Sequence, residues 1–278
     1  MPKTTWLVLV AVVVVGGCRA RGPKQASPLD RGPAVGEFVA PVGYADRALE
    51  AAGGLEAWKI ARKLEFDCVV TIYEPDGSFY LTEHHYEIYP WSNSIRISAR
   101  EPLGSFAWQL SHGKYEVLEG AGIADVSPLH GSYRDFAEAI LAVVTAPVRL
   151  CDESLLFVQE RTAVKMQGLW YYPIERICPD EQVTPNGGRP KVPQGAGVPA
   201  PSARRYAWPR VILYQNRDNS LVDTLWFADV DKGRFFVVRG YDYDEPRGKA
   251  VLVPTRVEIF RTDARAVPKE LLARVDVN

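Results

Sequence analysis

The stretch Leu64-Glu65-Phe66-Asp67-Cys68-Val69-Val70-Thr71-Ile72-Tyr73 is followed by Glu74-Pro75-Asp76-Gly77 and then by a second segment, Ser78 to Tyr89. Every second residue of the first stretch is apolar: Leu64, Phe66, Cys68, Val70 and Ile72. This period of two is typical of a half-buried strand, and proline early and glycine late in the tetrapeptide are typical of a turn. The three segments therefore predict an antiparallel hairpin.

Similar short segments continue along the chain, most of them bounded by glycine, proline or asparagine. We expect strands at residues 94–100, 105–111, 114–118, 155–158, 161–166, 169–175, 210–215, 221–229, 234–241 and 251–261. Their close spacing in sequence indicates an antiparallel meander.

Helical patterns occur at a few places only. Residues 45–52 and 55–62 are rich in helix formers and are separated by Gly53-Gly54. Residues 133–144 place Phe136, Ala139, Ile140 and Val143 at helical spacing, with Ser132 as the expected amino-terminal cap; residues 267–274 predict a short closing helix.

Together these elements predict a mainly β (α+β) fold. We expect one strongly bent antiparallel sheet, or an incomplete β-barrel, of about 10–12 strands with helices covering the concave side.

The amino terminus has the pattern of an export signal. Lys3 precedes an apolar run of about ten residues, which is too short to cross a bilayer core of roughly twenty residues. The next residues, Val15-Gly16-Gly17-Cys18, resemble the bacterial lipobox, which implies cleavage after residue 17 and lipid attachment to Cys18. An ordinary signal peptide with an incidental cysteine, or an uncleaved anchor, is the alternative. Arg19 after the cysteine implies an outer-membrane destination facing the periplasm.

The rest of the chain divides into a tether and a domain. Residues 18–43 contain four prolines and several glycines, which is typical of a flexible segment. Residues 44–278 are expected to form a single β domain, interrupted by a long polar loop at about 179–205.

The balanced charge of the chain argues against a partner that is recognised mainly by electrostatic attraction. The chain has 33 basic and 34 acidic residues, so no nucleic-acid partner is expected, and no cofactor is indicated. Export permits disulfides. Cys68 lies in a predicted strand and is expected to be buried and free, so Cys151 and Cys178 are the expected pair.

No motif for catalysis or metal binding is present. The nearest pattern is Glu83-x-His85-x-Glu87 on one face of a strand, for which a solvated polar face is the simpler interpretation. Serine-nucleophile signatures and phosphate loops are absent from the sequence. We therefore expect a protein that is not an enzyme.

The order of elements resembles the LolA/LolB family, the carriers and acceptors of bacterial lipoprotein sorting, whose fold is an incomplete barrel capped by helices. The resemblance rests on that order and on two stretches, Gly53-Gly54-Leu55-Glu56-Ala57-Trp58 and Leu225-Trp226-Phe227-Ala228-Asp229. No diagnostic motif accompanies it, so no functional residue of the family is carried over.

The resemblance implies a lipid-anchored envelope protein that binds or transfers an acyl chain or another lipid, with a cell-envelope protein as a further partner. Strand alternation predicts that the concave face forms the apolar ligand site, from Phe66, Val70, Ile72, Ile97, Phe106, Trp108 and Trp226. Two alternatives stay open: a structural lipoprotein with a filled core, and, third, a hydrolase with dispersed residues.

Overall fold

The computed structural model describes residues 43–101, 104–120, 133–152, 156–159, 162–177, 208–246 and 248–278. The chain divides into two units, 1–38 and 39–278, and every described residue belongs to the second unit. The lipobox with Cys18, the tether, Ser132 and the loop at 179–205 lie outside the described residues.

Within the described ranges, thirteen antiparallel strands form one sheet. Its first half comprises β1 (Leu64–Tyr73), β2 (Phe79–Tyr89), β3 (Ser94–Glu101), β4 (Gly104–Ser111) and β5 (Lys114–Glu119). Its second half comprises β6 (Leu156–Gln159), β7 (Val164–Met166), β8 (Leu169–Ile177), β9 (Arg210–Asn216), β10 (Val222–Asp229), β11 (Arg234–Asp244), β12 (Val253–Thr262) and β13 (Pro268–Val277). The order runs β5-β4-β3-β2-β1-β13-β12-β11-β10-β9-β8-β6, and β7 also pairs with β8. No pairing joins the two ends within the described residues, so the sheet is open, as the sequence predicts.

The first hairpin forms as expected. Tyr73 of β1 pairs with Phe79 of β2, and the backbone amide of Glu74 donates to the carbonyl of Ser78 over 2.9 Å. The Asp76 carboxylate accepts the Ser78 amide at 2.8 Å, and Gly77 adopts a φ of +85°. Only glycine enters this backbone region without steric cost, which explains its place in the turn.

The last strand corrects the sequence prediction. Residues 267–274 do not form a closing helix, because Pro268–Val277 is β13, which pairs with both β1 and β12. Lys269-Glu270-Leu271-Leu272-Ala273-Arg274 consists of good helix formers. The open edge of β1 offers a full ladder of backbone hydrogen bonds, and this long-range pairing outweighs local propensity.

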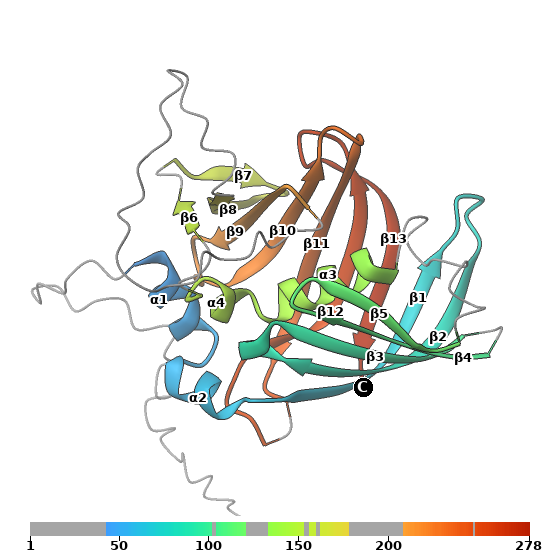
Figure 1. The fold of residues 1–278 in the computed structure, drawn as a ribbon. Helices are drawn as coiled ribbons and strands as arrows, with labels where there is room; N and C mark the ends of the chain where they lie inside the picture. Colours follow the sequence, from blue (N-terminus) through green and yellow to red (C-terminus); the bar gives the residue numbers. More distant parts are fainter. Residues whose placement is uncertain are drawn as a thin grey trace, which may run out of the picture. The chain divides into compact units, whose positions relative to one another are not determined.

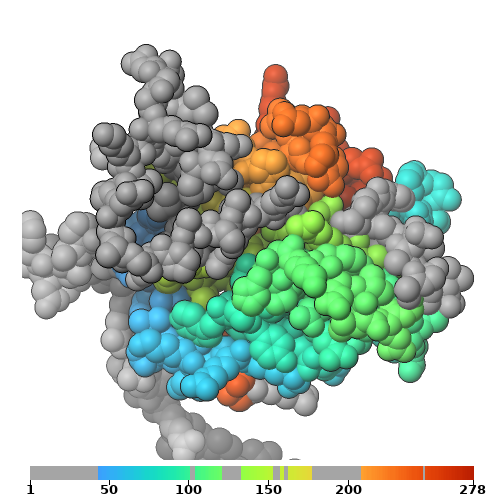
Figure 2. All heavy atoms as spheres, in the orientation of Figure 1, coloured from blue at the N-terminus to red at the C-terminus, as the bar shows by residue number. Residues whose placement is uncertain are grey.

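In the part of the chain that the structure describes, four α-helices accompany the sheet: α1 (Tyr44–Ala51), α2 (Leu55–Ile60), α3 (Tyr133–Val144) and α4 (Ala146–Arg149). A short 3₁₀ helix, η2 (Pro90–Ser92), follows β2. Helix α3 lies against β3 and β4 on one side and against β10, β11 and β12 on the other (Figure 1). In the space-filling view the green side chains of β3 to β5 lie in front, and the orange and red side chains of the last strands lie above them (Figure 2). No helix in the described part of the chain combines the length and apolarity needed to span a membrane.

Each face of the sheet carries its own apolar cluster. The inner face, which holds α3, contains the large core, in which α3 and alternate residues of most strands take part. The opposite face, which we call the outer face, carries a smaller cluster of Tyr171, Tyr214, Trp226, Ala228, Val237 and Ala266. An antiparallel sheet that packs on one side only would expose polar residues there, so the second cluster marks an unusual surface.

Candidate functional site: a cavity on the outer face of the sheet

The structure brings six of the seven predicted ligand-site residues together on the inner face. Phe66, Val70, Ile72, Ile97, Phe106 and Trp108 all belong to the large core, and each side chain is 7% exposed or less. Two of them pack against the helix: the rings of Phe106 and Trp108 lie 4.6 and 4.7 Å from the ring of Tyr133 in α3. This part of the concave wall is therefore covered by α3, and a ligand role for these residues stays a prediction.

Trp226 lies elsewhere. It projects to the outer face, stacks on Phe235 with ring centroids 6.1 Å apart, and has the guanidinium of Arg210 over its ring at 5.5 Å. Leu225 and Phe227, its neighbours in β10, belong to the inner core. Alternation along the strand thus separates Trp226 from the other six predicted residues.

The expected disulfide between Cys151 and Cys178 stays a prediction; in the structure the Cys151 thiol is free and donates to the carbonyl of Pro147 at 3.6 Å. Its expected partner, Cys178, lies outside the described residues. Cys68 is free and buried, and burial raises the pKa of its thiol.

The pattern around His85 forms an ion-pair cluster. The ligand atoms of Glu65, His85 and Glu87 lie within 4.8 Å of one another. The ammonium group of Lys63 pairs with both carboxylates, 2.6 Å from Glu65 Oε1, and these hydrogen bonds raise the pKa of Lys63. His85 Nδ1 lies 2.8 Å from Asp67 Oδ1. A cation of the chain itself already pairs with both glutamates, which fits the interpretation as a solvated polar face.

A cavity of about 620 Å³ opens beside the outer-face cluster. Its walls come from β7, β8, β9, β11 and the connection between β12 and β13. On β9 the lining residues are Arg210, Ile212 and Tyr214, which strand alternation places on one face. The cavity therefore forms where the β7–β8 hairpin meets three segments that are distant from it in sequence. Its volume falls within the range of about 300–1,000 Å³ that is usual for ligand pockets.

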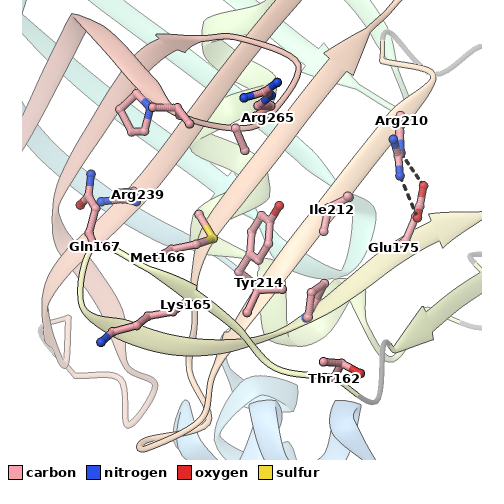
Figure 3. A pocket seen from close by; sticks show the side chains of 15 residues that line it. Thr162, Lys165, Met166, Gln167, Glu175, Arg210, Ile212, Tyr214, Arg239 and Arg265 are labelled. Carbon is pink, nitrogen blue, oxygen red and sulfur yellow. Dashed lines mark hydrogen bonds and ion pairs between the residues drawn. The ribbon is translucent and has the colours of Figure 1, made fainter.

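The centre of the cavity is apolar. Met166, Ile212 and Tyr214 lie in the middle of the close-up, with their side chains near one another (Figure 3). Met166 and Ile212 pack against the outer-face cluster that contains Tyr214. Burial raises the pKa of the Tyr214 hydroxyl, so this phenol stays protonated at neutral pH. Such a surface favours contact with hydrocarbon.

Four cationic side chains surround this apolar centre: Lys165, Arg210, Arg239 and Arg265 (Figure 3). Among the described lining residues the only carboxylate is Glu175. Arg210 donates two hydrogen bonds to it, Nε to Oε1 at 2.6 Å and a terminal nitrogen to Oε2 at 3.2 Å. Three cationic groups are thus left without a carboxylate in the lining.

Arg239 differs from the other three because it is buried, with 6% of its surface exposed. Among the described residues its Nε has no hydrogen-bond partner. Glu258 lies directly opposite Arg239 on β12, so its carboxylate is on the same face of the sheet. Its guanidinium hydrogen-bonds the Tyr241 hydroxyl, while burial raises the pKa of that hydroxyl. Asp223 is a more distant counter-charge, and burial raises the pKa of its carboxyl.

Sequence reasoning missed this cavity. One signal was present: Arg239 follows the apolar run Phe235-Phe236-Val237-Val238 inside a predicted strand. A lone arginine in a central strand requires a partner or a function. The position of Arg239 beside Met166 and Pro268 depends on pairings that the sequence alone does not specify.

No protein-family model matches the chain, and no curated protein matches it significantly. Solved structures that it resembles include a LolA superfamily protein from Nitrosomonas europaea (13% identity, TM-score 0.48) and a DUF1329 family protein from Desulfovibrio piger (11%, 0.42). A further one is a Vibrio parahaemolyticus domain described as an outer membrane lipoprotein-sorting protein (9%, 0.40). Each match covers 84% of this chain and 90%, 90% and 91% of the other chains, respectively. The first belongs to the superfamily that the sequence resembles, but identities this low do not transfer a function.

Proposed function

We propose that this chain is a lipid-anchored protein of the cell envelope that binds an acyl-type apolar ligand in the outer-face cavity. The observation that carries the proposal is a hollow of about 620 Å³ with an apolar centre, on a face of the sheet that α3 does not cover. Anchoring through Cys18, at the outer membrane facing the periplasm, is part of the proposal and is supported by the lipobox pattern.

The energetics favour a flexible hydrocarbon. Each methylene removed from water contributes about 0.8 kcal/mol, before the cost of immobilising the chain. Met166 is suited to such a ligand because its unbranched thioether adapts to contacts of different shape. A chain of several methylenes that reaches Met166 and Ile212 therefore gains enough to offset its lost freedom.

The lining also supports binding over catalysis. None of the residues that line the cavity is a serine, cysteine or histidine. A nucleophile with an adjacent general base, the usual arrangement for hydrolysis, is thus not provided by the described lining. The cavity is consistent with a carrier or acceptor.

A structural lipoprotein is the second candidate, and the packing of α3 favours it. Eleven of the twelve residues of α3 are buried, so the described inner face resembles a filled core. The two candidates predict different results for a ligand titration, because a purely structural protein has no reason to bind an acyl chain.

The test is a titration of the chain without signal and lipidated cysteine, residues 19–278, with a dansyl-labelled undecanoic acid. We expect saturable binding that Ile212→Glu weakens at least tenfold, because the carboxylate would stand in the apolar centre. Val230→Glu is the matched control, since Val230 is 64% exposed and outside the lining. Circular dichroism checks that each variant is folded.

Trp108→Glu separates the two faces. Weaker binding in this variant alone, with an intact fold, would move the ligand to the inner face. Absence of probe binding to the unmodified chain, together with no lipid in native mass spectra, would leave the structural candidate.

A further inference from the structure

Burying the Arg239 guanidinium at its position in the sheet carries an unfavourable desolvation free energy. Arg239 lies in β11, where it pairs laterally with Thr224 of β10 and Glu258 of β12. A charged group removed from water at such a central position costs several kcal/mol unless hydrogen bonds and a counter-charge compensate it. In the described residues the compensation is partial: Glu258 places a carboxylate directly opposite Arg239 on β12, but the Nε of Arg239 donates to nothing.

The neighbouring charges increase this deficit. Lys165 comes from β7 and Arg265 from the connection between β12 and β13, so two further segments present cations to the same hollow. Glu175 does not balance them, since its two oxygens are engaged by Arg210. Cations that gather around a cavity raise the local concentration of anions and steer them inward.

An acidic head group supplies what the cavity lacks. A carboxylate or a phosphate monoester accepts two parallel hydrogen bonds from a guanidinium, and such charge-assisted bonds are about twice as strong as neutral ones. The same cavity has an apolar centre at Met166 and Ile212. A ligand that satisfies both parts has an acidic head joined to a single hydrocarbon chain.

Resting on the proposed function, we infer that the ligand of the outer cavity is an anionic single-chain amphiphile and that Arg239 binds its acidic head. Arg265 and Lys165, which are exposed, attract the head to the entrance. The hydrocarbon chain lies over Met166 and Ile212. A free fatty acid and an alkyl phosphate both have this combination of an acidic head and a single hydrocarbon chain.

Calorimetric titration with three ligands of equal chain length tests this inference: decanoate, decyl phosphate and decanol. Residues 19–278 should bind at least one of the two anions at least tenfold more tightly than decanol, and added salt should reduce this preference at the exposed entrance. The stronger anion identifies the carboxylate or the phosphate as the natural head.

Arg239→Gln should lower the affinity for the preferred anion at least tenfold and leave decanol binding within twofold. Retained decanol binding also shows that the variant is folded. Arg256→Gln is a matched control, because Arg256 lies on neighbouring β12, stacks on Tyr241 at 4.8 Å and likewise has an Nε without a partner among the described residues. Arg256 does not line the cavity, so its variant should bind all three ligands as the unmodified chain does.

A double variant of the exposed entrance, Lys165→Gln with Arg265→Gln, adds a test with little risk to folding. It should weaken binding of the preferred anion about threefold. Equal affinities for the anions and decanol, or equal weakening of all three by Arg239→Gln, would overturn the inference and leave the apolar site standing. Failure of all three ligands to bind would instead refute the proposed function.

Discussion

Replacing Gly53 with alanine should destabilise the domain by roughly 3 kcal/mol. Gly53 follows α1 and has a φ of +108°, which an L-residue adopts only at a cost of about 1–2 kcal/mol. A Cβ at this position would lie 2.3 Å from the carbonyl oxygen of Ala250, whereas ordinary contacts begin at 3.4 Å. The strand connection at Ala250 would therefore have to move by about 1 Å.

That movement would disturb two hydrogen bonds that share one acceptor. The carbonyl of Ala52 accepts the amide of Leu252 and the indole nitrogen of Trp58, each at 3.0 Å. Loss of one such hydrogen bond destabilises the fold by about 1 kcal/mol. Together with the cost of the positive φ, this gives the expected destabilisation of roughly 3 kcal/mol.

Gly77→Ala isolates the effect of the close approach. Gly77 has a φ of +85°, but a Cβ added there would meet nothing within 4 Å, so alanine should cost only about 1 kcal/mol. Urea unfolding followed by tryptophan fluorescence measures both variants, with unchanged m-values as the check that the unfolded states are comparable. A Gly53→Ala variant no less stable than Gly77→Ala would refute the packing argument.

Two further predictions concern the ion pairs and the anchor. Arg234 forms ion pairs with Asp229 of β10 at 3.1 Å and with Asp135 of α3 at 3.2 Å. Arg234→Ala should therefore lower the free energy of unfolding by about 2–4 kcal/mol. The control Arg261→Ala removes an exposed ion pair and should lower it by less than about 1 kcal/mol. Burial opposes ionisation of Asp229, but hydrogen bonds from Arg234 and Lys232 lower its pKa. The stabilisation from this carboxylate is therefore complete above about pH 4 and is lost as the pH falls through the lowered pKa of the folded state. Urea midpoints measured across pH 2–6 should decline less steeply in the Arg234→Ala variant. Cys18→Ala should abolish acyl labelling and release the protein from the membrane fraction, and unchanged membrane association would contradict lipidation.

The sequence predicts the fold well where local patterns and long-range pairing agree. The alternation from Leu64 to Ile72 identifies β1, and helical spacing identifies α3 with its observed bounds. It fails at 268–277, where helix propensity is overridden by pairing with two strands distant in sequence. The sequence does not predict the outer-face cavity, for a related reason. Met166 and Arg239 share a surface only through the order of β7 to β13, which no local pattern encodes.

Helix α3 covers the inner face of the sheet and leaves the outer face accessible to a ligand. Spacing alone indicates one apolar stripe, through Phe136 and Ile140, and hence a helix that lies on the sheet with a polar back. Leu141 and Ala142 lie outside that stripe and are equally buried, as are the polar residues Asp135 and Glu138. A helix that is buried on nearly all sides has to be enclosed, and α3 is enclosed by strands from both halves of the sheet. Because this enclosure occupies the described inner face, an apolar ligand is better accommodated on the outer face, where the second cluster provides hydrocarbon contact and Arg239 provides the charge.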